Sequence, residues 1–302
     1  MTGLSDYTAD NLLNWLTGGV AEPSLPSVYC ALFTAVGTDA GTGFTEVSGG
    51  SYARVQVAGS VSTNNTTASG NPTLHFSSVP SWVTSGMYIY DATAPTVIPA
   101  ATTVTGTSST TVTMSANASG SGVGNGDSIV FTAFSAASGS QPSQITNNAV
   151  ITFPQATANW GTVVAWGLYD ASSSGHLLVW DFLGAFNWLP VSSSSVGSGN
   201  GAVLTTHAHG YSNGDPIVAS TEYGGSFPTV TQGAITSYTI NFAANVTTDT
   251  LTLSSSPSAP SSANAVWTST TGDFMVRKLV QQSIPQNVTA SFAASALTAL
   301  AA

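Results

Sequence analysis

Two strongly apolar runs in the middle of the chain constrain the fold more than any other feature. Val163–Tyr169 and Leu177–Leu183 are rich in Val, Leu and aromatic residues, and the polar segment Asp170–Gly175 separates them. Short runs on either side of a Ser/Gly turn are typical of a β-hairpin that is buried on at least one face. We therefore predict an all-β protein: a mainly antiparallel, sandwich or jelly-roll-like core with one short N-terminal helix and two inserted β modules.

The charge content limits the partners that the chain can have. Charged residues make up 5% of the 302 residues, whereas soluble domains carry about 25%. Arg54, Arg277 and Lys278 are the three basic residues against 13 acids, so the net charge is −10. Binding to a nucleic acid backbone is therefore not expected. A surface of Ser, Thr, Asn and Gly is cheap to desolvate, which favours packing against copies or partners; adaptation to a particular solvent or to secretion is the alternative.

Cysteine content and hydropathy add further expectations. Cys30 is the single cysteine, so no intrachain disulfide can form, and we expect this residue to act as a small buried hydrophobe in a core strand. The start of the sequence lacks a basic segment, and no apolar run approaches the roughly 18 residues of a membrane span. We therefore expect neither a signal peptide nor a membrane segment.

The segment Leu4–Gly19 is predicted to form the N-terminal helix. Ser5 or Asp6 can cap its start, and Gly18 can end it in a left-handed conformation. Its apolar residues recur at helical spacing along one face, which must therefore pack against another surface. The residues that we predict to form an interface are Leu12, Leu13, Trp15, Leu16 and Arg54.

Two long Ser/Thr/Gly/Asn-rich segments suggest how the chain is divided. We predict inserted β modules at 58–142 (module A) and 189–273 (module B), and a core formed by 1–57, 143–188 and 274–302. The core strand at the start of the last segment is expected to return from module B. Insertions at surface loops are tolerated because loop-closure entropy grows slowly with length.

The two modules share an alternating Thr pattern. Thr110–Ser115 in module A and Asp249–Ser254 in module B both place a hydroxyl residue at every second position. This indicates a weak internal repeat. The alternative is that Thr-rich strands simply resemble one another, because patterns of period two are degenerate.

Thirteen short blocks outside the modules resemble one known family. The blocks are Leu4–Tyr7, Val28–Thr34, Thr38–Ala40, Glu46–Gly50, Tyr52–Arg54, Ile151–Pro154, Ala156–Thr157, Trp160–Val163, Gly167–Asp170, Gly175, Leu177–Leu178, Ile284–Pro285 and Ser291–Leu297. Together they resemble a family of small virion proteins of tailed bacteriophages, described as tail fibre or head decoration proteins. The resemblance implies a final strand in the tail Ser291–Leu300, where local propensity favours a helix. Modules A and B depart from the family pattern.

The candidate catalytic and metal-binding residues are few. Asp170 and Asp181 flank the hairpin and could form a pair of catalytic carboxylates, but an acid beside a turn more often accepts backbone hydrogen bonds, as Asp170 is expected to do. His207 and His209 would point to one side of a strand, and three copies around a three-fold axis could then bind one transition metal. The alternative is a plain turn. We predict no enzymatic activity and no cofactor.

Aromatic side chains in the modules are a second candidate for ligand binding. They could stack on the sugar rings of a host surface glycan, but a thin β module also needs large residues in its own core. The aromatics concerned are Trp82, Tyr88, Tyr90, Trp188, Tyr211, Tyr223, Phe227 and Trp267.

The resemblance and the composition together predict a structural protein of a phage virion that is assembled in the host cytoplasm. We expect a homotrimer that decorates and cements the capsid by packing a charge-poor surface against the major capsid protein and sister copies. The alternative is a tail fibre or tail-tip adhesin that binds a host receptor.

Overall fold

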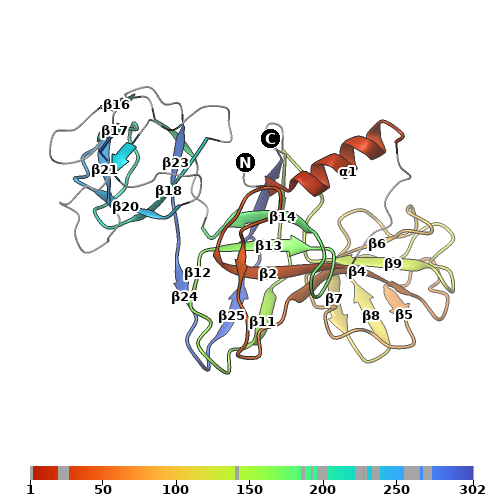
Figure 1. Ribbon diagram of the computed structural model, residues 1–302. Coiled ribbons are helices and arrows are strands. Elements are labelled where there is room, and N and C mark those ends of the chain that lie inside the picture. The colour runs from red at the N-terminus through yellow and green to blue at the C-terminus, as the bar shows by residue number, and fades with distance from the viewer. Residues whose placement is uncertain are drawn as a thin grey trace. The chain divides into compact units, whose positions relative to one another are not determined.

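The protein is built almost entirely from antiparallel strands, as predicted, with a single helix among the residues described (Figure 1). The computed structural model describes residues 3–19, 27–139, 143–184, 188–191, 193–195, 203–221, 227, 230–232, 239–254, 266–267 and 274–301. The chain forms two compact units: the large unit, Thr2–Asp181 with Ser283–Ala302, and the small unit, Phe182–Gln282.

The predicted hairpin lies within the main sheet of the large unit, beside β2. Its strands β13 (Ala165–Tyr169) and β14 (Leu177–Phe182) are neighbours in the order β1-β14-β13-β2-β4-β9-β6, and β3 pairs with β2 beside this path. Every residue of β13 is buried. The other strands of the large unit are β1 (Gly3–Leu4), β2 (Val28–Ala35), β3 (Thr45–Glu46), β4 (Val55–Ser62), β5 (Thr73–His75), β6 (Tyr88–Asp91), β7 (Val104–Thr107), β8 (Thr111–Met114), β9 (Ser128–Thr132), β10 (Ser143–Thr146), β11 (Ile151–Gln155), β12 (Thr162–Val163), β25 (Thr289–Phe292) and β26 (Thr298–Ala301).

The helix and the tail also confirm the sequence-based expectations. Helix α1 spans Asp6–Leu16, its N-cap is Ser5, and Gly18 follows its end with a φ of 76°. The tail forms strands, not a helix, because β25 pairs with β11 and β26 pairs with β10. Cys30 is fully buried in β2, and burial raises the pKa of its thiol.

The small unit contains a seven-stranded sheet in the order β15-β23-β18-β20-β21-β17-β16. Its buried cluster includes Leu204, Ile217, Leu251 and Val276. The strands are β15 (Leu189–Pro190), β16 (Ser193–Ser195), β17 (Val203–Thr205), β18 (Pro216–Ser220), β19 (Val230–Gln232), β20 (Asn241–Ala244), β21 (Thr250–Ser254), β22 (Val266–Trp267) and β23 (Met275–Lys278), and β24 (Gln282–Ser283) falls on the unit boundary.

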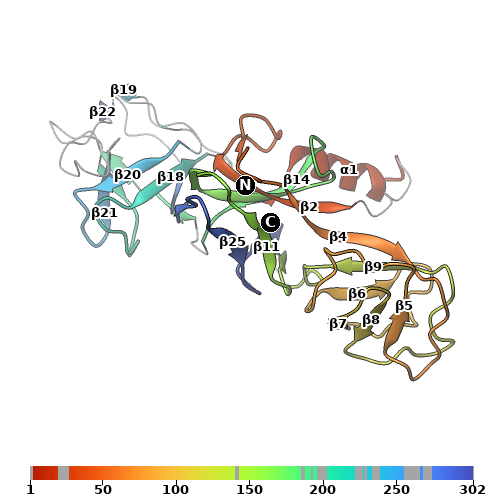
Figure 2. The same cartoon turned by 90° about the horizontal axis from the view of Figure 1, so that it is seen from below.

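Two groups of strands share one pairing pattern, and we call them the β4–β9 repeat and the β15–β23 repeat. In the first, β4 and β6 flank β9, while β5 and β7 flank β8 (Figure 2). In the second, β15 and β18 flank β23, while β17 and β20 flank β21. The Thr-rich strands β8 and β21 therefore occupy equivalent places, in agreement with the predicted internal repeat.

The small unit contains the whole of module B, but two features of the sheets differ from the predicted division. Strand β4 runs through residue 58 without interruption and pairs with β2 by its first half and with β9 by its second half, so module A shares a sheet with the core. Strand β23, which was expected to return to the core, pairs with β18 and β15 in the small unit. The alternation of Met275–Lys278 predicted a strand but carried no information about its partner.

Candidate functional site

Helix α1 is fastened to the large unit through its first turn. The Ser5 hydroxyl accepts a hydrogen bond from the Thr8 N–H at 3.2 Å and donates one to the Leu177 carbonyl. The Thr8 hydroxyl donates to the Leu178 carbonyl at 2.9 Å, and the Ser5 N–H donates to the same carbonyl at 3.0 Å. Because these partners lie at the start of β14, the buried hairpin sets the position of the helix N-terminus.

Stacked rings reinforce this attachment. Tyr7 of α1 stacks on His176 with ring centroids 4.0 Å apart and an angle of 5° between the rings. The His176 Nδ1 lies 2.9 Å from Asp170 Oδ2, and the His176 N–H donates to Asp170 Oδ1 at 2.7 Å. Burial alone would raise the pKa of Asp170, but the hydrogen bonds from His176 outweigh it and lower the pKa. Asp170 therefore accepts a backbone hydrogen bond across the turn, as its sequence context predicts.

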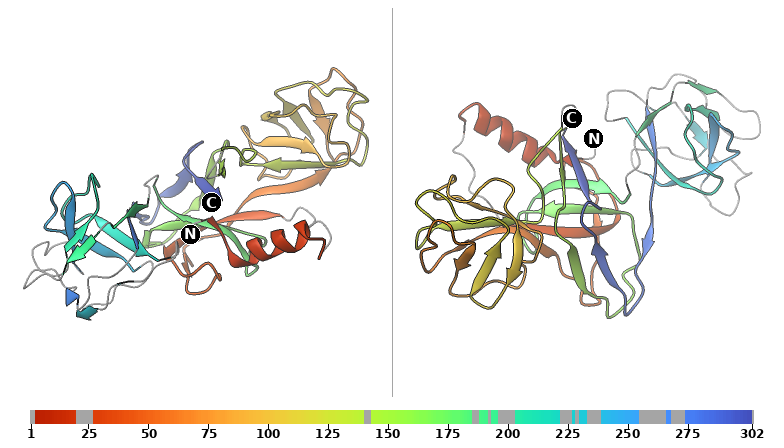
Figure 3. Two further views of the ribbon diagram at one scale, coloured as in Figure 1. Left: turned by 90° about the horizontal axis from the view of Figure 1, so that it is seen from above. Right: turned by 180° about the vertical axis from the view of Figure 1, so that it is seen from behind.

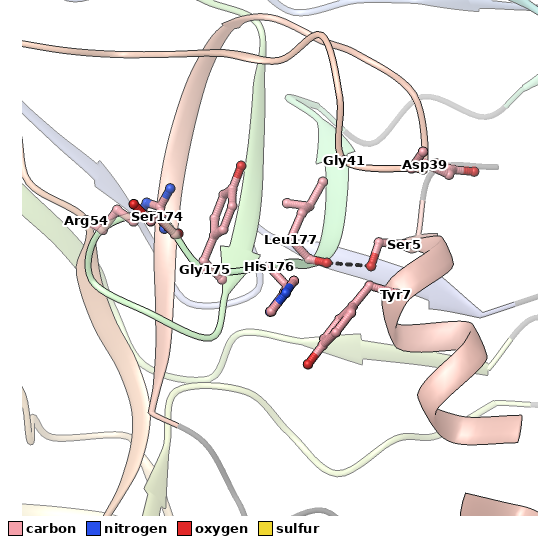
Figure 4. A pocket seen from close by; sticks show the side chains of 11 residues that line it. Ser5, Tyr7, Asp39, Gly41, Arg54, Ser174, Gly175, His176 and Leu177 are labelled. Carbon is pink, nitrogen blue, oxygen red and sulfur yellow. Dashed lines mark hydrogen bonds between the residues drawn. The ribbon is translucent and has the colours of Figure 1, made fainter. Parts of the chain in front are cut away.

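A pocket of about 310 Å³ lies between the first turn of α1 and the loop that precedes β14 (Figure 4). Its charged side chains are already engaged in hydrogen bonds: Asp39 accepts from the Trp180 indole, His176 contacts Asp170, and Arg54 is paired. The lining residues are Ser5, Tyr7, Asp39, Ala40, Gly41, Arg54, Tyr169, Ser174, Gly175, His176 and Leu177.

Arg54, one of the predicted interface residues, is held inside the large unit. Its side chain is 7% exposed and makes two hydrogen bonds to Glu46, of 2.9 Å from Nε and 2.7 Å from Nη2. Nη1 donates to the carbonyls of Ala171 and Ser174 at 2.9 and 2.7 Å, and the guanidinium lies 3.5 Å from the centre of the Tyr169 ring. These contacts fix the turn of the central hairpin and leave Arg54 little surface for a partner.

The other predicted interface residues lie on an uncovered face of α1. The exposed fractions are 41% for Leu12, 60% for Leu13, 37% for Trp15 and 65% for Leu16. No residue of the helix is buried, and both views of Figure 3 show α1, in red, on the outside of the large unit. The apolar face that the sequence predicted to pack is thus not covered by the part of the chain that the structure describes.

His207 and His209 are not arranged as predicted. They lie in a turn between β17 and β18, and Ala208 between them has a φ of 51°. His207 is 88% exposed and lies 2.8 Å from Asp249, whereas His209 is 7% exposed and its Nδ1 accepts from the Tyr211 N–H at 3.0 Å. The premise of one shared strand face is therefore wrong, because a left-handed residue breaks the alternation. Within the described ranges, no group of three or more His, Cys, Asp or Glu side chains is placed to hold a metal ion.

Several aromatics of the modules pack inward. Tyr211 is 8% exposed, Phe227 packs against the core of the small unit, and Trp82 contacts Phe131 edge to face. Tyr90 is exposed. Tyr223 and the side chain of Trp267 lie outside the described residues, so glycan binding stays a prediction.

Sequence reasoning missed the roles of two residues at this site. Tyr7 is 41% exposed, lines the pocket and stacks on His176, and the sequence indicated neither residue as part of the attachment of α1. The only sequence signal was the presence of an acid six residues before His176, since the stacking partner Tyr7 lies far away along the chain.

The family comparison decides the class of protein. A model of the family described as podophage GP4 fiber I protein gp80 matches residues 3–98 and 86–187, which together are more than half of the chain. The chain belongs to this family. It is therefore a fibre-type structural component of a phage virion, and the predicted tailed-phage family is confirmed.

The extent of the match differs from the sequence-based expectation. The matched ranges run through module A, which was expected to depart from the family, whereas module B and the C-terminal blocks lie outside them. The comparisons with curated proteins and with solved structures gave no match. No helix in the described part of the chain is long and apolar enough to cross a membrane.

Proposed function

We propose that this chain is a subunit of the tail-fibre apparatus and that it attaches to the rest of the virion through the exposed apolar face of α1. The observation that carries the proposal is the uncovered face of Leu12, Leu13, Trp15 and Leu16 in a member of a fibre family. Burying a fully exposed Leu contributes about 1.5–3 kcal/mol. Four partly exposed apolar side chains therefore form a docking surface of useful strength.

The charges of the chain indicate the chemistry of the partner. Within α1 the charged residues are Asp6 and Asp10, and the segment from residue 11 to 19 is uncharged. With a net charge of −10, the chain will be attracted to a virion protein whose apolar groove has a basic rim, and such charge complementarity speeds association. Binding of a helix in a groove is a common mode of recognition.

Capsid decoration is the second candidate function. The observation in its favour is that the sequence lacks a sustained heptad run or a Gly-X-Y tract, which elongated trimeric fibres normally need. In that role, homotrimers would bridge neighbouring copies of the major capsid protein. The family description favours the fibre role, since it names a fibre protein.

Copy number separates the two roles. Quantitative mass spectrometry of purified virions, with labelled peptides of this chain and of the major capsid protein, measures copies per particle. A fibre subunit is expected in a few tens of copies or fewer, and hundreds of copies would replace the fibre proposal with decoration. Light scattering on the purified chain tests the homotrimer independently, and adsorption assays on glycan-deficient hosts test receptor binding.

A further inference from the structure

A buried carboxyl oxygen in the β4–β9 repeat has no hydrogen-bond partner. Asp91, the last residue of β6, is fully buried. Its Oδ1 accepts hydrogen bonds from the N–H groups of Thr93 and Ala94 at 2.8 and 2.9 Å. Its Oδ2 is buried without a partner. A buried carboxylate oxygen in this state costs free energy unless something else compensates its charge.

A second carboxyl group lies beside it. The side chain of Asp127, which precedes β9, is close enough to Asp91 for a proton to be shared between the two groups, and its own Oδ2 accepts from the Gly124 N–H. Burial raises the pKa of Asp91, two backbone hydrogen bonds oppose the rise, and the charge of Asp127 adds to it. Because ionised carboxylates offer only acceptors, adjacent ones need a proton or a cation between them.

We infer that Asp91 and Asp127 bind a divalent cation, for which Ca²⁺ is the best suited. The two N–H groups that Asp91 Oδ1 accepts from lower the pKa of Asp91, and a cation would offset the opposing rise that burial and the charge of Asp127 cause. Carboxylate oxygens are the ligands that Ca²⁺ prefers, and it commonly completes its shell with water and carbonyl oxygens. Asp127 is half-buried, which leaves one side of the site open to those waters.

The loop before β9 is shaped around the Asp127 carboxylate. A Cβ at Gly124 would lie 2.8 Å from Asp127 Oδ2, so a larger residue here would displace the Asp127 carboxylate from its present position. The chain after β6 is joined to the same region, since the Ala92 N–H donates to the Ser128 carbonyl at 2.9 Å. A cation between the two carboxylates would therefore tie the end of β6 to the start of β9.

The β15–β23 repeat provides an internal contrast. Asp91 pairs with Ile129 across β6 and β9, and Ser220 pairs with Met275 across the equivalent strands β18 and β23. A Gly-Asp dipeptide stands two residues before each of Ile129 and Met275 along the sequence. Ser220 thus replaces Asp91, and the second repeat lacks one of the two carboxylates. We expect one site per chain.

The test is the thermal unfolding of the full chain in excess CaCl₂ and in EDTA. At 100 times its dissociation constant, Ca²⁺ is expected to raise the Tm of the large unit by roughly 5–10 °C. In the Asp91→Asn variant the amide can donate to Asp127 while its oxygen still accepts from Thr93 and Ala94. This variant is expected to fold and to lose the calcium response.

The matched control is Asp215→Asn, because Asp215 also follows an Asn-Gly pair but forms an ion pair with Lys278 at 2.8 Å. It is expected to keep the full calcium response. Calorimetric titration with CaCl₂ should give one site in the wild type and none in Asp91→Asn. Equal Tm values in CaCl₂ and EDTA, with no heat of binding, would overturn the inference and assign a shared proton to the pair.

Discussion

The β4–β9 repeat and the β15–β23 repeat have the same pattern of strand pairing, although their sequences differ. In the first, β4 extends into the main sheet of the large unit, so its strands β4, β9 and β6 share one sheet with the central hairpin. In the second, the strands close a separate sheet around their own cluster. The comparison shows that one pattern of alternating strands and glycine turns can be part of a larger sheet or form a unit of its own.

The two repeats differ more in their charged side chains than in the pairing of their strands. The first contains the adjacent carboxylates of Asp91 and Asp127, whereas the second contains the ion pair of Asp215 and Lys278 near the start of β18. The first pair is repulsive when both carboxylates are ionised, whereas the second pair is attractive and joins the start of β18 to the end of β23. Substitutions in the two cores, in the ion pairs, at the glycine turns and at the surface acids test how far the two regions behave alike.

The largest expected effect comes from deleting core side chains. Phe131 in β9 is 1% exposed and Leu251 in β21 is fully buried. Phe131→Ala should cost about 3–5 kcal/mol and Leu251→Ala about 2–5 kcal/mol. Differential scanning calorimetry should show that Phe131→Ala lowers only the transition of the large unit and Leu251→Ala only that of the small unit. Equal shifts of both transitions in either variant would contradict the separation into units.

The ion pairs come next in size. Arg54→Met removes one partner of the bidentate pair with Glu46 and is expected to cost about 3 kcal/mol, because the Arg54 side chain is 7% exposed. Lys278→Met should cost about 1 kcal/mol or less, since the Lys278 and Asp215 side chains are 26% and 17% exposed. Urea unfolding measures both. An equal cost for the two substitutions would show that burial does not set the difference.

The glycine turns that precede the equivalent strands β6 and β18 should both lose stability when the glycine is replaced by alanine. Gly86 precedes β6 with a φ of 89°, and Gly214 precedes β18 with a φ of 87°. An alanine at either position is strained in this left-handed region by about 1–2 kcal/mol. A Cβ at Gly86 would also approach the Asn148 carbonyl to 3.2 Å, so Gly86→Ala should cost more than Gly214→Ala. A larger cost for Gly214→Ala than for Gly86→Ala in urea unfolding would contradict the added cost of the Asn148 contact.

The smallest effect concerns acids paired with histidines, one in each unit. Asp170 contacts His176 and Asp249 contacts His207, and the pKa of each acid is lowered. A lowered pKa contributes stability that is complete above the unfolded pKa of about 3.9 and is lost as the pH falls through the folded pKa. Asp170→Asn should therefore reduce stability at pH 7 by about 1 kcal/mol or less.

The difference between wild type and Asp170→Asn should shrink below about pH 4, where the wild-type carboxylate also becomes neutral. Asp249→Asn should have a smaller effect, because Asp249 is more exposed than Asp170. Urea unfolding between pH 3 and pH 7 measures both series. A difference that grows on acidification would reverse the assigned direction of the Asp170 pKa.

Local sequence patterns predicted the helix and many of the strands. Which distant strands pair with one another could not be predicted from such patterns. The hairpin around Asp170, the Ser5 cap and the strand of Cys30 could be predicted because their signals lie within a few residues. The partner of β23 and the contact between Asp91 and Asp127 depend on register between distant strands, which no local pattern specifies.

The residues of the candidate site could also be predicted only in part, because their surroundings depend on contacts between distant segments. The apolar residues of α1 were found from their helical spacing, but their exposure could not be known without the neighbours of the helix. The prediction for His207 and His209 failed because one left-handed residue, Ala208, places the two rings in different environments. Arg54 was predicted to face a partner, and only the fold shows that it holds the turn of the hairpin.

The central claim is that the apolar face of α1 is covered by another virion protein. The most direct measurement is the amount of subunit in virions that carry Leu13→Gln with Leu16→Gln. Gln has nearly the helix propensity of Leu, so the variant should fold with an unchanged Tm. The control is Val150→Thr with Val288→Thr, two exposed apolar positions outside α1. We expect the control at wild-type occupancy and the α1 variant at least tenfold below it; wild-type occupancy of both would contradict the account.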